Sequence, residues 1–484
     1  MLQRKAYDRL LEWKRDSKGS TALLVEGARR VGKTTLVAEF GRREYQSCLF
    51  IDFNEADREV ISYFEDYRTD LDTLFLYLSA YYRVDLVDRN TLIVFDEVQL
   101  YPPARALIKF LVADGRYDYV ETGSLLSIRQ NVEDILLPSE EDALRLDPLD
   151  FEEFLWAMGE RQLAELIKLQ FSSLKSLPDG LHRRAMGLMR EYMLVGGMPS
   201  PLAKYVEQRK FAPVEAEKRR IVQLYRNDIA RFAHGYEYRV TSVFDEIPGQ
   251  LSKHEKKFTL SSLGKDARMR TYEESFFWLS DARIANICHA ASEPSVGLAP
   301  SKDSSALKCY MADTGLLVTL AFANGRETGE DVYRSILRGN IGINEGMLTE
   351  NVVAQMLVAA GHKLYFYAQS GKRANEKRME IDFLIVKPYA DAAGKPRVSP
   401  IEVKSPRQYG TTSLDRFKND LLWGHGPLRT RARGGRPRPG PSTGSSPRPA
   451  WRSGCSSSWR SRSPPTATWR SRATAGPRRP RRCR

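Results

Sequence analysis

The most constraining feature of this chain is a short run near its start. Residues 25–40 read VEGARRVGKTTLVAEF, and within them Gly27 to Thr34 fit the pattern G-x-x-x-x-G-K-[ST]. The apolar run TALLV before this pattern predicts a buried strand, and KTTLVAEFGRR after it has helical spacing. A glycine-containing loop between a strand and a helix is typical of a phosphate-binding P-loop (Walker A motif), in which backbone amides hold phosphate oxygens. The pattern therefore predicts an α/β fold with a parallel sheet.

Each position in this loop has an expected role. Gly27 and Gly32 let the backbone wrap with its amides pointing inward. Lys33 is expected to reach the β- and γ-phosphates of a nucleotide, and the hydroxyl of Thr34 is expected to bind Mg²⁺. The positions predicted to bind nucleotide are Gly27, Ala28, Arg29, Arg30, Val31, Gly32, Lys33, Thr34, Thr35 and Ser124.

Two further strands supply acids and hydroxyls for such a site. Residues 91–99 read TLIVFDEVQ, an apolar strand that ends in Asp96 and Glu97 in the manner of a Walker B motif. We expect Asp96 to hold Mg²⁺ and Glu97 to polarise the attacking water, and a simple strand cap is the alternative for this pair. The next predicted strand, YDYVETGS, ends at Thr122 and Ser124. A hydroxyl there would contact the γ-phosphate as a sensor, and a plain turn is the alternative.

With these motifs the chain resembles the prokaryotic AAA-type ATP-binding proteins. In that family a P-loop module with G-x-R-R-x-G-K-T-T and a DE-[IV]-Q strand is joined to a C-terminal domain of unknown function. The resemblance covers roughly residues 1–420, because further landmarks follow in the family's order: DPLDFEEFL, YMLVGGMPSP, LYRNDIARF, KCYMADTGLL, GMLTENVVAQML, MEIDFLI and IEVKS. It implies ATP and Mg²⁺ as cofactors and ATP hydrolysis as the activity.

The middle of the chain, residues 150–235, is rich in Leu, Glu, Arg and Lys at helical spacing, with breaks near Pro178 and Gly196. This pattern predicts a helical lid. Within it, Arg226 or Arg231 would approach a γ-phosphate as an arginine finger, from the lid itself or from a neighbouring subunit of a homo-oligomer. An ordinary solvated helix charge is the alternative for both arginines.

For the next segment, residues 236–325, the resemblance implies a winged-helix-like module. Basic residues of this segment that would face DNA phosphates are Lys253, Lys256, Lys257, Lys265, Arg268 and Arg270. Glu255 and Asp266 interrupt the basic run, so a packing or partner surface is the alternative. DNA is therefore a candidate partner.

Two apolar segments nearer the C-terminal end carry acids inside their apolar runs, and a buried acid needs a partner. MEIDFLIV with Asp382 and SPIEVKSP with Glu402 and Lys404 predict the two strands of a hairpin. Glu402 and Lys404 are two residues apart and share a face, and Asp382 would lie opposite them. With Glu350 from the preceding helix, the set resembles the PD-(D/E)xK nuclease core, although Ile381 stands where that motif has proline. The resemblance implies that the carboxylates hold Mg²⁺ and that the lysine assists the attacking water.

The formal net charge of +14 is concentrated at one end of the chain. Residues 424–484 contain 16 Arg, no Lys and no acid, so the residues before them carry 59 basic and 61 acidic side chains. This tail has no periodicity and is predicted to be disordered. It lacks Asp, Glu, Lys, Ile, Val, Asn, Gln, Phe, Tyr and Met, which suggests a GC-rich gene read out of frame from about residues 421–424. A genuine Arg-rich arm that binds phosphates is the alternative.

The sequence predicts neither a membrane segment nor a secretory signal. No run approaches the ~18 consecutive apolar residues of a membrane helix, and the N-terminal MLQRKAYDRLLEWKRD predicts an amphipathic helix. The five cysteines form no C-x-x-C pair and are expected to be reduced packing residues. We therefore expect a cytoplasmic protein with no membrane partner.

The predicted architecture has five parts. They are a P-loop AAA-type ATPase domain (1–160), a helical lid (161–235), a winged-helix-like module (236–325), a restriction-endonuclease-like α/β domain (326–423) and the tail (424–484). The fourth part is expected to be truncated, because the tail begins where the sheet of such a domain would continue. One predicted function is an ATPase coupled to a nuclease-like or DNA-interacting domain. The alternative is a regulatory ATP switch whose C-terminal domain is a non-catalytic binding scaffold.

Overall fold

The computed structural model describes residues 2–123, 140–253, 257–294, 298–322, 330–338, 344–369, 379–390, 396–404 and 412–417. Three predictions lie outside these residues: the nucleotide contact of Ser124, the phosphate contact of Lys256 and the disorder of the tail 424–484. The described residues form an α/β fold with two five-stranded sheets, which confirms the predicted fold class.

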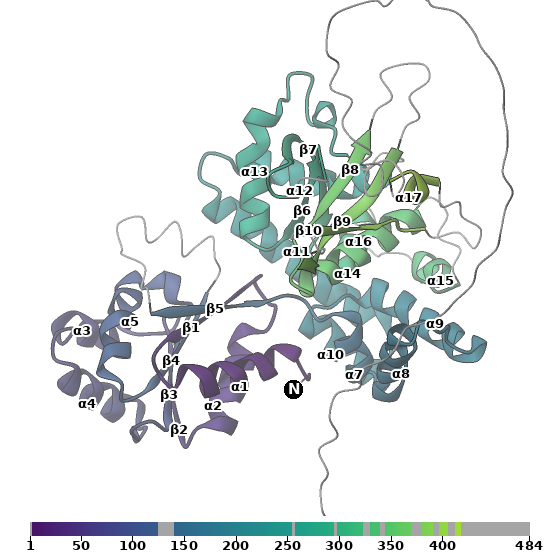
Figure 1. Cartoon of the computed structure of the whole chain (residues 1–484). Coiled ribbons are helices and arrows are strands. Elements are labelled where there is room, and N and C mark those ends of the chain that lie inside the picture. Colours follow the sequence, from purple (N-terminus) through teal and green to yellow (C-terminus); the bar gives the residue numbers. More distant parts are fainter. Residues whose placement is uncertain are drawn as a thin grey trace, which may run out of the picture. The chain divides into compact units, whose positions relative to one another are not determined.

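The first sheet is parallel and contains the P-loop strand (Figure 1). Its strands are β1 (Ala22–Gly27), β2 (Ser47–Asp52), β3 (Thr91–Asp96), β4 (Asp118–Gly123) and β5 (Glu141–Leu146). The order across the sheet is β2-β3-β4-β1-β5. Strand β4 therefore lies between the P-loop strand β1 and the acidic strand β3, and all three strands point the same way.

Helices cover both faces of this sheet because its strands are apolar on both sides. Leu23 and Val25 of β1 belong to one core cluster, while Leu24 between them belongs to another, as the two-residue period of a strand requires. The first cluster includes side chains of α1 (Lys5–Ser17) and α2 (Lys33–Glu44). The second includes side chains of α3 (Arg58–Asp66), α4 (Leu71–Tyr82), the short helix η1 (Val98–Leu100) and α5 (Pro102–Asp114).

The next segment is helical, in agreement with its periodicity. Asp150 and Glu153 form a reciprocal capping box at the start of the first helix, which satisfies backbone N–H groups there. The helices are α7 (Phe151–Ala157), α8 (Arg161–Ser172), α9 (Asp179–Val195), α10 (Pro199–Gln208) and α11 (Phe211–Phe232). Helix α11 has 22 residues and begins the connection to the second sheet.

The second sheet is mixed, with strand order β10-β9-β8-β6-β7. Its strands are β6 (Ala285–Ala291), β7 (Lys302–Met311), β8 (Tyr365–Gln369), β9 (Met379–Ala390) and β10 (Pro396–Ile401). Strands β6 and β8 are parallel and the other pairs are antiparallel. The remaining helices are α12 (Glu237–Leu251), η2 (Leu260–Ser262), α13 (Met269–Asp281), α14 (Thr314–Ala321), α15 (Glu330–Arg338), α16 (Asn344–Ala359) and α17 (Thr412–Phe417).

This second sheet bears on two predictions. Strands β9 and β10 form the hairpin expected for the two acid-bearing segments, with Ile401 opposite Phe383, but β10 ends at Ile401, so Glu402 and Lys404 follow the strand and do not lie within it as expected. Strands β6 and β7 join the same sheet through β8, so the sheet crosses the predicted boundary between residues 325 and 326. Residues 236–325 therefore contribute strands β6 and β7 to the C-terminal sheet, in addition to several helices.

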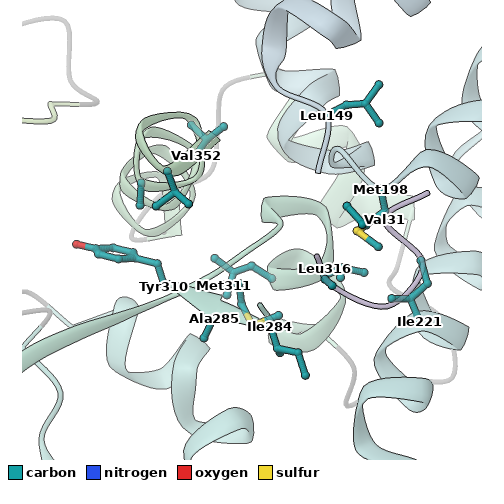
Figure 2. Close-up of a cluster of buried hydrophobic side chains, with 14 of the residues drawn as sticks. Val31, Leu149, Met198, Ile221, Ile284, Ala285, Tyr310, Met311, Leu316 and Val352 are labelled. Carbon is teal, nitrogen blue, oxygen red and sulfur yellow. The ribbon is translucent and has the colours of Figure 1, made fainter. Parts of the chain in front are cut away.

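One core cluster joins segments that are far apart in the sequence (Figure 2). It includes Val31 of the P-loop, Met198, Ile221 of α11 and Leu316 of α14. Burying an aliphatic side chain of this size stabilises a fold by about 1.5–3 kcal/mol. The P-loop is thus anchored by apolar packing from the helices that follow its domain.

Within the described part of the chain, no helix is both long enough and apolar enough to cross a membrane.

Candidate functional site

The parallel sheet brings the predicted site residues to one edge. Strands β1 and β3 end at Gly27 and Asp96, and β4 between them ends at Gly123. Ligands of parallel α/β sheets bind beyond the carboxyl ends of the strands. A cavity of about 910 Å³ lies at this edge, and its lining includes Lys33, Thr34 and Glu97.

The P-loop needs its glycines for steric reasons. A Cβ at Gly27 would lie 2.3 Å from the carbonyl oxygen of Leu146, which is closer than any side chain tolerates. Gly32, at the N-cap of α2, has φ of 97°, a left-handed conformation that glycine adopts at little cost. Both positions therefore support the predicted loop geometry.

Lys33 is held inside the loop. It is buried, and its Nζ donates to the carbonyl oxygens of Gly27 at 3.1 Å and Ala28 at 3.3 Å. Burial lowers the pKa of Lys33, and the nearby carboxylates of Glu97 and Asp96 act in the opposite direction. A phosphate group in the cavity would supply the negative charge that best compensates this buried ammonium ion.

Thr34 and Asp96 lie side by side, as a magnesium site requires. The Thr34 hydroxyl is 3.1 Å from Oδ1 and 2.9 Å from Oδ2 of Asp96, which is 2 % exposed. The Thr122 hydroxyl, at the end of β4, also donates to Asp96. Burial raises the pKa of Asp96, while the hydrogen bonds from Thr122 and Thr34 lower it. Hydroxyl and carboxylate oxygens are ligands that Mg²⁺ prefers, so these residues fit that ion.

Glu97 lines the same cavity and has an unusual backbone. Its φ of 53° is left-handed, which is uncommon for a residue with a side chain and is found more often at functional sites. Its backbone N–H donates to the Thr122 hydroxyl at 3.4 Å. The side-chain amide of Gln99 donates to the Glu97 carboxylate. Gln99 was not among the expected site residues, although its place two residues after Glu97 in the same motif was an available signal.

The lid helix α11 contributes one of the two arginines proposed as fingers. Arg231 lines the cavity, whereas Arg226 forms an ion pair with Asp245 of α12 at 2.7 Å. Asp228 also lines the cavity and forms an ion pair with Arg29 of the P-loop. Burial raises the pKa of Asp228, and the charge of Arg29 lowers it. Nothing local in the sequence pointed to Asp228.

The N-terminal segment also fastens the loop. The guanidinium of Arg4 donates to the carbonyl oxygens of Val31 at 3.1 Å and Asp147 at 2.6 Å, and to the Glu153 carboxylate at 3.3 Å. Arg4 is buried. Arg4 was not among the expected site residues, because its partners lie up to 149 positions away.

The C-terminal acids gather around Lys308, which was not among the expected site residues. Lys308 of β7 is completely buried, and its Nζ lies 3.3 Å from Glu350, 3.0 Å from Glu380 and 3.6 Å from Asp382. Burial lowers the pKa of Lys308, but the charges of the three carboxylates outweigh it and raise the pKa above its ordinary value. The Tyr310 hydroxyl also donates to Glu350.

Glu402 and Lys404 lie directly after β10, next to Asp382. The backbone N–H of Val403 donates to Asp382 Oδ2 at 2.8 Å, and Lys404 Nζ is 2.6 Å from Glu402 Oε1. Glu402 Oε2 is buried and has no hydrogen-bond partner within the described residues. The described residues contain no group of three or more His, Cys, Asp or Glu side chains arranged to hold a metal ion.

The basic residues expected to face DNA are exposed where they are described. Lys253, Lys257, Lys265, Arg268 and Arg270 are all exposed around η2 and the start of α13. Exposed side chains are compatible with contact to DNA and with contact to another partner, so both stay predictions.

Comparison with known proteins supports the N-terminal assignment. Residues 19–155 match the model of an AAA domain. Residues 186–327 match a domain of unknown function (DUF8612), and residues 345–425 match another domain of unknown function (DUF4143). No curated protein matches the chain. Among solved structures, the crystal structure of Cdc6p from Pyrobaculum aerophilum is similar at 13% identity over 70% of this chain and 96% of that chain, with a TM-score of 0.23.

The AAA match contains the whole P-loop together with Asp96, Glu97 and Thr122. Their geometry at the edge of a parallel sheet agrees with that match. The N-terminal part of this chain therefore matches an AAA domain and has the site geometry of a P-loop fold, and matches to two domains of unknown function follow it.

Proposed function

We propose that the protein is a Mg²⁺-dependent ATPase. The observation that carries this proposal is the placement of Lys33 inside the P-loop together with the contact between Thr34 and Asp96. Lys33 would bind the terminal phosphates, and Thr34 and Asp96 would hold Mg²⁺, which supplies positive charge to the phosphate oxygens. Glu97 would accept a proton from the attacking water, with Gln99 fixing the orientation of its carboxylate.

The role of Glu97 predicts a defect in chemistry with nucleotide binding retained. Glu97→Gln keeps the shape of the side chain but removes the base, so we expect ATP hydrolysis to fall by about 10²-fold. The exposed Glu65 of α3 supplies the matched control, Glu65→Gln, which should leave hydrolysis unchanged. Phosphate release and binding of a fluorescent ADP would be measured for each variant. Near-normal hydrolysis by Glu97→Gln would remove Glu97 from the mechanism.

We further propose that this ATPase is coupled to a C-terminal domain that is nuclease-like or interacts with DNA. Helix α11 supports the coupling, because Tyr225 donates to the Arg29 carbonyl oxygen at 3.3 Å near one end. Toward its other end, buried Lys218 donates to the Gly315 carbonyl oxygen and to the Tyr333 hydroxyl, each at 3.2 Å. A nuclease role is supported by the juxtaposition of Asp382 with the Glu402 segment and by the buried oxygen of Glu402.

A second candidate function has its own observation. The ammonium group of Lys308 lies among Glu350, Glu380 and Asp382, where it compensates their charge without a metal ion. This favours the regulatory alternative, in which the ATPase is a switch and the C-terminal domain is a binding scaffold. A cytoplasmic location and assembly into a homo-oligomer, with Arg231 at the nucleotide, remain predictions under either function.

DNA cleavage separates the two functions. If the C-terminal domain is a nuclease, the full chain will nick a supercoiled plasmid in Mg²⁺, and Lys404→Ala will slow nicking by about 10²-fold. Lys363→Ala, an exposed lysine before β8, is the matched control and should cleave normally. Gel electrophoresis of the plasmid measures both. Equal nicking by Lys404→Ala would favour the scaffold, whereas absence of nicking would agree with either the scaffold or the expected truncation of this domain.

A further inference from the structure

The ion pair between Arg29 and Asp228 joins the P-loop to the lid. Arg29 is the third residue of the loop pattern, and its Nη1 contacts Oδ1 of Asp228 on α11. The side chain of Asp228 is 17 % exposed and that of Arg29 is 50 % exposed. Both residues line the cavity that contains Lys33 and Thr34.

A carboxylate is an unexpected group in a cavity built for phosphate. Burial lowers the pKa of Lys33, and the negative charge of Asp228 opposes this effect, although more weakly than the charges of Glu97 and Asp96. Burial raises the pKa of Asp228. The charges of Arg29 and Arg231 lower this pKa, and the charge of Glu97 raises it. Negative charges that share a partly buried cavity repel each other, and each further phosphate of a nucleotide increases that repulsion.

Arg29 has two competing partners in this arrangement. Its guanidinium can pair with the Asp228 carboxylate, or with phosphate oxygens, to which arginine binds strongly through charge-assisted hydrogen bonds. The pairing with Asp228 is half-exposed at Arg29, so solvent weakens the attraction between the two charges. A nucleotide phosphate can therefore displace the carboxylate without a large energetic cost.

We propose that Asp228 is a specificity-determining residue that competes with the terminal phosphate of a nucleoside triphosphate for Arg29. Binding of the triphosphate transfers Arg29 from Asp228 to the γ-phosphate, whereas a diphosphate leaves the Arg29–Asp228 pair intact. The carboxylate thus lowers the affinity for triphosphate more than the affinity for diphosphate. This inference rests on the proposed function, because it requires nucleotide in the cavity.

The test compares two nucleotides on the full chain. Asp228→Asn keeps an oxygen that can accept from Arg29 but removes the charge. We expect Asp228→Asn to bind fluorescently labelled ATPγS at least about fivefold more tightly than wild type, with little change for labelled ADP. Asp245→Asn is the matched control. Asp245 of α12 forms an ion pair with Arg226, which lies on the same helix as Asp228, and Asp245 is absent from the cavity lining. Its affinities for both probes should equal those of wild type.

A double-mutant cycle distinguishes competition for Arg29 from a simple loss of structure. Arg29→Gln should weaken ATPγS binding, and adding Asp228→Asn to that variant should produce a smaller gain than in wild type, because the competition is already gone. Equal changes for both probes, no change, or weaker ATPγS binding by Asp228→Asn would overturn the inference. If wild type binds neither probe, or if Lys33→Ala binds both normally, the proposed function itself is wrong and the inference falls with it.

Discussion

Replacing Lys33 with alanine is expected to lower ATP hydrolysis by about 10²–10³-fold, the range seen when one preorganised hydrogen-bond donor is removed from an active site. Lys33 is the buried cation at the centre of the loop, held by the Gly27 and Ala28 carbonyl oxygens. Its removal leaves the β- and γ-phosphates without their direct positive partner, so binding of nucleotide should weaken together with catalysis. Phosphate release and binding of a fluorescent nucleotide measure the two effects separately.

Lys109→Ala provides the matched control for this variant. Lys109 is an exposed lysine of α5 in the same domain and is absent from the cavity lining, so its loss should leave hydrolysis unchanged. Thermal denaturation of both variants shows whether the domain remains folded. Hydrolysis by folded Lys33→Ala within a factor of about ten of wild type would contradict the assignment of this cavity to ATP.

The P-loop domain was predictable because its information is local. The residues from Gly27 to Thr34 are consecutive, and the strand and helix around them have clear patterns. Asp96 and Thr122 lie at strand ends, where a parallel sheet brings side chains together, so their meeting follows from the fold class. The hairpin that places Asp382 beside the Glu402 segment was also predictable, because its two strands have apolar patterns and lie close together in the sequence.

The contacts that the sequence did not reveal are long-range and polar. Arg4 bonds to the P-loop, Asp228 pairs with Arg29, and Lys308 lies among acids from α16 and β9. Each is a charged residue within a helix or strand, or just before one, where its local pattern resembles that of an ordinary surface charge. Their partners are set by packing between segments, which periodicity does not encode. Lys308 illustrates this. It lies on β7, whereas Glu380 and Asp382 lie on β9, and the two strands belong to one sheet only through β6 and β8, which lie between them.

Lys308→Met is the second large effect that we expect. Methionine keeps much of the volume of lysine but removes the ammonium group, which leaves Glu350, Glu380 and Asp382 facing one another. Breaking a buried ion pair by removing one partner costs about 3–5 kcal/mol. We therefore expect a large drop in the urea midpoint of the C-terminal sheet, together with faster hydrogen exchange of residues 302–311 and 344–359.

The effect of this substitution should depend on pH. Without Lys308 the repulsion among the crowded carboxylates penalises their charged forms, and protonation at low pH relieves that repulsion. A group whose folded pKa is raised stabilises the fold at low pH and destabilises it as pH increases. The deficit of Lys308→Met relative to wild type should consequently be larger at pH 8 than at pH 5. Lys302→Met, an exposed position on the same strand, should change stability by less than about 0.5 kcal/mol at either pH.

Addition of Mn²⁺ to Lys308→Met then distinguishes the two roles of the C-terminal domain. If the acids can form a divalent metal site, Mn²⁺ will replace the missing ammonium charge and restore much of the lost stability, because a ligand that binds the folded state stabilises it. If Lys308 is a fixed structural counter-ion, Mn²⁺ will not restore stability, since the carboxylates are held for a side chain rather than for a metal. Unchanged stability of Lys308→Met without Mn²⁺ would contradict the buried cluster itself, because three adjacent carboxylates would then need no compensating charge.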